Sequence, residues 1–149
     1  MRVDIDNQSK IPLDSAFLES LESLFLGVLE NLELQHKTCE LLLVDNTTIQ
    51  ALNAEFRGID TPTDVLSFPL ESEFSPLLGS IVISVEYAQK AATELKHSLE
   101  NEIALLFIHG ILHLAGFNHE TDNGEQREKE AELVEHFHLP TSLIVRTQG

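Results

Sequence analysis

The sequence predicts a small α/β (α+β) protein with a mixed β-sheet of about four strands, surrounding helices and one central buried helix. Three observations lead to this prediction. Short apolar or alternating runs are typical of strands, and the longer runs between them repeat their apolar residues at helical spacing. One helical run is apolar nearly all round, which is typical of a helix covered on several sides. Strands that alternate with helices favour a sheet packed against helices.

The strands are expected where short apolar runs are bounded by turn-forming residues. The first run, Arg2–Asn7, alternates and is expected at a sheet edge. The remaining strands are expected at Cys39–Val44, Val65–Pro69 and Gly79–Ser84. Loops are expected at Arg57–Asp64 and Glu71–Leu78, where turn-forming residues gather.

Helices are expected after residues whose side chains can accept hydrogen bonds from a first turn. These expected caps are Asp14 or Ser15, Asp45, Ser84 and Ser98. The helix after Ser98 contains the run IALLFIHGILHL, and Gly116 is well placed to end it. A last, more charged helix is expected in 125–138.

Length and charge limit the kinds of function that fit. A chain of 149 residues is expected to form one domain, 1–149. Nine basic and 25 acidic residues give a net charge of −16, which opposes non-specific binding to nucleic acid or anionic membrane. No apolar run approaches the roughly 20 residues of a membrane span, and the first residues have no signal-peptide core, so a cytoplasmic location is expected. The single cysteine, Cys39, is expected to be a small buried apolar residue.

Three of the seven histidines lie within eleven residues, in the segment HGILHLAGFNH, 109–119. On a helix, His109 and His113 lie on one face, one turn apart. Gly116 ends the helix, so His119 can return to the same ion. The spacing matches the His, His, Gly and His positions of the metzincin zinc signature. Three imidazoles that leave a coordination position open are typical of catalytic zinc, although nickel, copper or iron also fit.

Gly110 stands where a metzincin protease has its glutamate general base. No carboxylate replaces this glutamate between the first two histidines. Two interpretations of Gly110 stay open: it leaves space for a substrate group beside the metal, or it allows close packing of the helix.

Without a base, the metal has to lower the pKa of a bound water toward roughly 7 and polarise a substrate oxygen. This chemistry suits phosphodiester hydrolysis, where an arginine often neutralises charge on phosphate oxygens. Arg57 lies in a segment rich in turn formers just before a strand. It is either such a catalytic arginine, or a solvated side chain, or a partner of Asp60 or Asp64.

The segments NAEFRGIDTPTDVLSFP, 53–69, and HGILHLAGFNH, 109–119, resemble the YbeY family of bacterial endoribonucleases in sequence, order and separation. The resemblance implies a compact α/β fold with one Zn²⁺ held by His109, His113 and His119, and Arg57 as the functional arginine. It implies a metal-dependent, single-strand-specific endoribonuclease that acts in ribosomal RNA maturation, at the small-subunit RNA 3′ end, and in ribosome quality control. RNA and the ribosome or its proteins are then the expected partners, and no membrane or DNA partner is expected.

The chain departs from the family pattern at two positions. Asn118 replaces the aspartate often found before the third histidine, and Ser80 replaces an aspartate in the strand at 79–84. Neither an acid–base role at 118 nor an acidic role at 80 can therefore be transferred. Two other functions remain as alternatives, a metal-dependent peptidase or amidase and a non-catalytic ribosome-assembly factor with a structural zinc. The other four histidines are expected to be surface or helix-end residues: His36, His97, His136 and His138.

Overall fold

The computed structural model describes residues 2–70, 74–117 and 122–139. Its four strands form one sheet in the order β1-β2-β4-β3. β1, β2 and β4 are parallel, and β3 runs antiparallel to β4 at the edge. The elements in chain order are β1 (Val3–Asn7), α1 (Ser15–Leu32), β2 (Thr38–Val44), α2 (Asn46–Arg57), β3 (Val65–Pro69), β4 (Leu77–Ser84), α3 (Val85–Leu95), α4 (Leu99–Leu114) and α5 (Glu125–His136).

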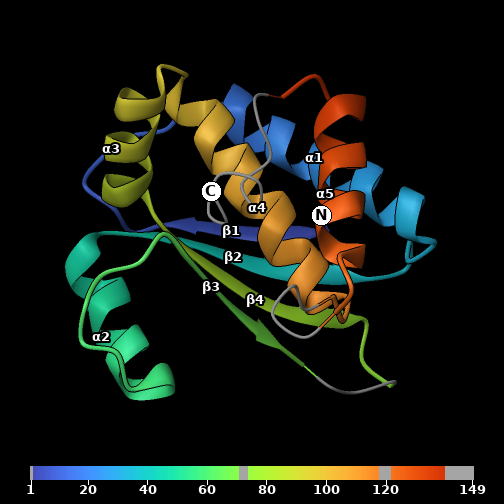
Figure 1. Ribbon diagram of the computed structural model, residues 1–149, viewed down its shortest axis with the longest axis horizontal. Coiled ribbons are helices and arrows are strands. Elements are labelled where there is room, and N and C mark those ends of the chain that lie inside the picture. Colours follow the sequence, from blue (N-terminus) through green and yellow to red (C-terminus); the bar gives the residue numbers. More distant parts are fainter. Residues whose placement is uncertain (1, 71–73, 118–121, 140–149) are drawn as a thin grey trace.

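The helices cover the two faces of the sheet unequally. α1, α3, α4 and α5 lie on one face, and α2 lies on the other (Figure 1). The larger core lies on the first face, where Phe25 of α1 stacks on Phe107 of α4 with ring centroids 6.1 Å apart. A smaller core lies beneath α2 and includes Ile49, Leu66 and Val82. The predicted mixed sheet with a central buried helix is confirmed.

The strand and helix predictions differ from the structure at particular ends. The last helix, expected in 125–138, ends at His136. β4 begins at Leu77, two residues before the expected Gly79, because Leu77 already pairs with Thr38 of β2. α2 includes Arg57 and ends against Gly58, which adopts a left-handed conformation, so Arg57 is not in the following loop. Residues 71–73 of the expected loop at 71–78 lie outside the described residues.

Three of the expected caps form as predicted. Asp14, Ser84 and Ser98 each accept a hydrogen bond from a backbone N–H in the first turn of their helix. Asp45 occupies the cap position of α2, but its side chain accepts a hydrogen bond from the Lys10 N–H instead.

Two smaller predictions concern the single cysteine and the absence of a membrane-spanning run. Cys39 is 1% exposed, as expected for a buried apolar residue. Its burial, together with nearby Glu22 and Glu40, raises the pKa of the Cys39 thiol well above its usual range. No helix among the described ranges is long and apolar enough to cross a membrane.

Candidate metal centre

α4 is the element that positions the histidines, and it is buried almost completely. Between Glu102 and Leu114 every residue is buried except His109 and His113, which are both partly exposed. An interval of four residues puts these two side chains on the same face of the helix. Along this part of α4, only the imidazoles of His109 and His113 are therefore appreciably accessible to solvent.

The two imidazole rings lie side by side with centroids 4.9 Å apart and planes tilted by 57°. With zinc–nitrogen bonds of about 2.1 Å and tetrahedral geometry, two imidazoles on one zinc ion have centroids roughly 5 Å apart. The spacing in the structure therefore suits a shared ion. The structure brings His109 and His113 together as the sequence predicted, whereas His119 and Asn118 lie outside the described residues. The described residues contain no group of three metal-binding side chains.

α4 ends in a Schellman motif just after the two histidines. The Phe117 N–H donates to the Leu112 carbonyl, and the Gly116 N–H donates to the His113 carbonyl. Gly116 has a φ of +102°, which favours glycine. The predicted helix stop at Gly116 is confirmed, and the chain leaves the helix directly after the second histidine.

Gly110 is required for close packing between α4 and the sheet. A Cβ atom built on Gly110 would lie 2.9 Å from Cγ2 of Ile81, which is fully buried in β4. The packing interpretation of Gly110 is therefore correct, and the idea that it leaves space for substrate is wrong. The same contact leaves no room for the glutamate of a metzincin protease at this position.

Glu130 of α5 is a site residue that the sequence analysis missed. Its carboxylate is fully buried, and its Oε2 atom lies 3.1 Å from Nδ1 of His109. The buried residues of α5 are Gln126, Glu130, Leu133 and Val134. Their spacing of four, three and one marks the inner face of a helix, and this pattern is the signal that could have found Glu130.

His97 lies just after the end of α3, as expected for a helix-end residue, but it is not a surface residue. Its Nε2 atom lies 2.6 Å from Oε1 of Glu102, and its side chain is only 11% exposed. This contact links the segment after α3 to the first turn of α4, at the opposite end of α4 from His113. His36, His136 and His138 are exposed, as expected.

Arg57 lies on the face of the sheet opposite α4, in the last turn of α2 (Figure 1). Its side chain is exposed, and it forms no ion pair with any described residue. The expected alternative partners are engaged elsewhere: Asp60 accepts a hydrogen bond from Gln50, and Asp64 accepts one from the Val65 N–H. Neighbouring Phe56 meets Phe68 of β3 edge to face, with ring centroids 5.1 Å apart. The structure thus fixes the last turn of α2 against β3, but it does not bring Arg57 into contact with the histidines.

A helix-borne histidine pair with a buried carboxylate behind it, set against a small mixed sheet, is an arrangement typical of metal-dependent hydrolases. Comparison with known proteins narrows this class. The sequence model of the family described as Endoribonuclease YbeY matches residues 4–138. The chain belongs to this family.

Relatives with similar sequences, and one solved structure, match this chain over nearly its whole length. The proteins named Endoribonuclease YbeY from Aliarcobacter butzleri and Helicobacter pylori strain P12 are 51% and 53% identical to it, covering 97% and 98% of this chain and 98% and 99% of their own. The one from Campylobacter jejuni serotype O:23/36 is 57% identical, over 89% of this chain and 93% of its own. The solution structure of TM1509 from Thermotoga maritima is 31% identical, covers 91% of each chain and has a TM-score of 0.62.

Proposed function

We propose that this chain is a metal-dependent endoribonuclease that cleaves single-stranded RNA in ribosomal RNA maturation and ribosome quality control, in the cytoplasm. The small-subunit RNA 3′ end is the proposed substrate region. The observation that carries the proposal is the match to the Endoribonuclease YbeY family over residues 4–138, which spans both motifs. The paired imidazoles of His109 and His113, which are the only partly exposed residues of α4 between Glu102 and Leu114, support it.

The donor set fits a zinc ion. His109, His113 and His119 would hold one Zn²⁺ per chain, and another divalent transition ion also suits imidazole ligands. When bound, the ion supplies Lewis-acid chemistry: it lowers the pKa of a water molecule and polarises a phosphate oxygen. The chain would supply the orientation of the rings: Nδ1 of His109 lies 3.1 Å from Oε2 of Glu130, and Nε2 would face the ion.

Arg57 would bind the phosphate backbone of the RNA. Its guanidinium is exposed and has no ion-pair partner among the described residues, so it can form paired hydrogen bonds to a phosphate. β3 is an edge strand, with α4 over one face and α2 over the other. A single strand of RNA that crosses the β3 edge could contact both Arg57 and the histidine pair.

The acidic balance of the chain argues for help from a partner. At a net charge of −16, the protein has little general attraction for the RNA backbone. We infer that the ribosome or one of its proteins delivers the RNA, so that local contacts replace the missing long-range attraction.

The alternative functions have less support. A peptidase of the metzincin type needs a carboxylate at position 110, and the contact between Gly110 and Ile81 leaves no space for one. A purely structural zinc does not account for an arginine kept exposed beside the β3 edge.

The test is cleavage of a single-stranded RNA by wild type, His113→Ala and His136→Ala, with the zinc content of each protein measured. His136 is an exposed histidine of α5 and serves as the matched control. The proposal predicts that His113→Ala loses both zinc and cleavage while His136→Ala keeps both. Cleavage by His113→Ala at the wild-type rate, with contaminating nucleases removed, would overturn the proposed site.

A further inference from the structure

A fully buried carboxylate lies behind the histidine pair. The Glu130 side chain of α5 is 0% exposed. Its Oε2 atom lies 3.1 Å from Nδ1 of His109 in α4, and the His109 side chain is 11% exposed. A carboxylate can only accept a hydrogen bond, so this contact requires the proton of a neutral His109 to be on Nδ1. Nε2 of the same ring is then the unprotonated nitrogen.

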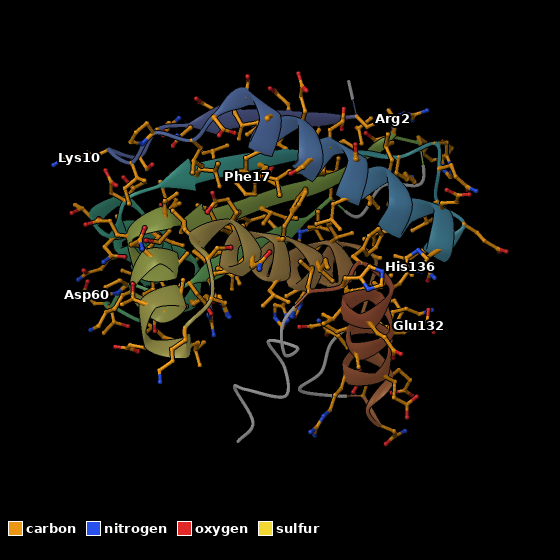
Figure 2. The ribbon with its side chains drawn as sticks, turned by 90° about the horizontal axis from the view of Figure 1, so that it is seen from above. Arg2, Lys10, Phe17, Asp60, Glu132 and His136 are labelled. Atoms are coloured by element: carbon orange, nitrogen blue, oxygen red, sulfur yellow. The ribbon has the colours of Figure 1, made fainter. Side chains whose placement is uncertain are left out.

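Burying a carboxylate in this position is costly, and α5 does not need one in order to pack. Removing an ionised group from water carries a desolvation cost that the contacts of the group in the folded protein have to offset. Leu133 and Val134 already supply apolar contacts from the same face of α5. Glu132 of the same helix, in contrast, has an exposed side chain on the outer side of α5 (Figure 2).

We propose that Glu130 is a positioning residue: it holds His109 as the Nδ1-protonated tautomer and fixes the ring so that Nε2 is presented to the ion that His113 also ligates. The metal-binding part of this inference rests on the proposed function. The orientation of His109 by Glu130 does not depend on RNA cleavage. Contacts of this kind behind a metal ligand change metal affinity by about 10- to 100-fold when they are removed.

The competing explanation is that Glu130 only attaches α5 to α4. The chain offers a matched control for it. Glu102 is also a buried glutamate paired with a histidine, His97, at a distance of 2.6 Å, and it lies at the other end of α4. A purely structural role predicts the same consequences for both glutamates, whereas a positioning role predicts a change at the metal centre only for Glu130.

The experiment compares wild type with Glu130→Gln, Glu130→Leu and Glu102→Gln. The tautomer of His109 is read by ¹⁵N NMR of the imidazole in the metal-free protein, and zinc affinity is measured by competition with a chelator. Glutamine keeps an accepting oxygen but not the charge, so it should weaken zinc binding less than leucine does. We expect roughly a tenfold loss for Glu130→Gln, up to about 100-fold for Glu130→Leu, and less than about twofold for Glu102→Gln.

The NMR result decides the inference independently of catalysis. A His109 that is Nδ1-protonated in wild type and shifts toward the Nε2-protonated form in Glu130→Leu supports it, even if no RNA is cleaved. If Glu130→Leu does not fold, the tautomer and zinc affinity of Glu130→Gln decide. Wild-type zinc affinity and an unchanged His109 tautomer in a folded Glu130→Gln would overturn the inference and leave Glu130 as a packing residue. A wild type that binds no zinc would refute the proposed function instead.

Discussion

Replacing Gly110 with alanine separates the two roles that the sequence left open for this glycine. The added Cβ would lie 2.9, 3.1 and 3.2 Å from three side-chain atoms of Ile81, which is fully buried. Overpacking of this kind costs about 1–3 kcal/mol, and replacing a helix glycine by alanine returns about 1 kcal/mol. We therefore expect Gly110→Ala to lower the free energy of unfolding by about 1 kcal/mol.

The Ile81→Ala background provides the control, because it removes all three contacting atoms. Ile81→Ala alone should cost about 2–5 kcal/mol through the cavity it creates. In that background Gly110→Ala should become stabilising by about 1 kcal/mol, since only the helix propensity remains. The two substitutions should therefore be coupled by about 2 kcal/mol in a double-mutant cycle.

The assay is urea unfolding of the four proteins, followed by circular dichroism. A Gly110→Ala protein that is more stable than wild type by about 1 kcal/mol, as for an unconstrained helix glycine, would refute the packing argument. Unchanged stability with a loss of RNA cleavage would instead favour the role in substrate access.

Three further predictions concern Arg57, the net negative charge of the protein and Cys39. Arg57→Ala should lower RNA cleavage by about 10²-fold or more while zinc content stays at the wild-type value. Arg57→Lys should recover only part of the cleavage rate, because lysine lacks the paired donors of arginine. A loss of zinc from Arg57→Ala as large as its loss of cleavage would contradict the role of Arg57. Cleavage of naked RNA should be slow at physiological salt and should accelerate when ribosomal subunits are added, and fast, site-correct cleavage of naked RNA would contradict the need for a partner. Cys39 should resist thiol reagents in the native protein and react after unfolding. The folded thiol keeps its proton, whereas an unfolded cysteine ionises near about pH 8.5. The contribution of Cys39 to the free energy of unfolding is therefore complete below about pH 8.5 and declines above it. Urea unfolding of Cys39→Ala should lack this decline.

The parts of the fold that depend on local pattern could be predicted from the sequence. Apolar periodicity located the strands and helices, and the caps at Ser84 and Ser98 form the predicted hydrogen bonds. The interval between His109 and His113 fixed their common face, because helix geometry alone determines it. The resemblance to the YbeY family is confirmed by the family match.

The parts that the sequence could not decide depend on contacts between distant elements. The role of Gly110 depends on Ile81 of β4, and no local pattern of α4 contains that information. Charged residues surround Glu130 in the sequence of α5, and only its place on the buried face of the helix distinguishes it from them. The sequence predicts His97 at the surface or a helix end, because no local pattern shows that Glu102 of α4 contacts it. The roles of Arg57, His109, His113 and His119 as site residues stay predictions.

Zinc titration of metal-free protein tests the central claim most directly. The protein is stripped with a chelator, shown by circular dichroism to stay folded, and then given zinc in increments while cleavage of a single-stranded RNA is measured. The proposed site predicts that the stripped protein is inactive and that activity rises in proportion to bound zinc up to one ion per chain. Undiminished cleavage by folded, metal-free protein would contradict the claim that the histidines of α4 hold the ion that cleaves RNA.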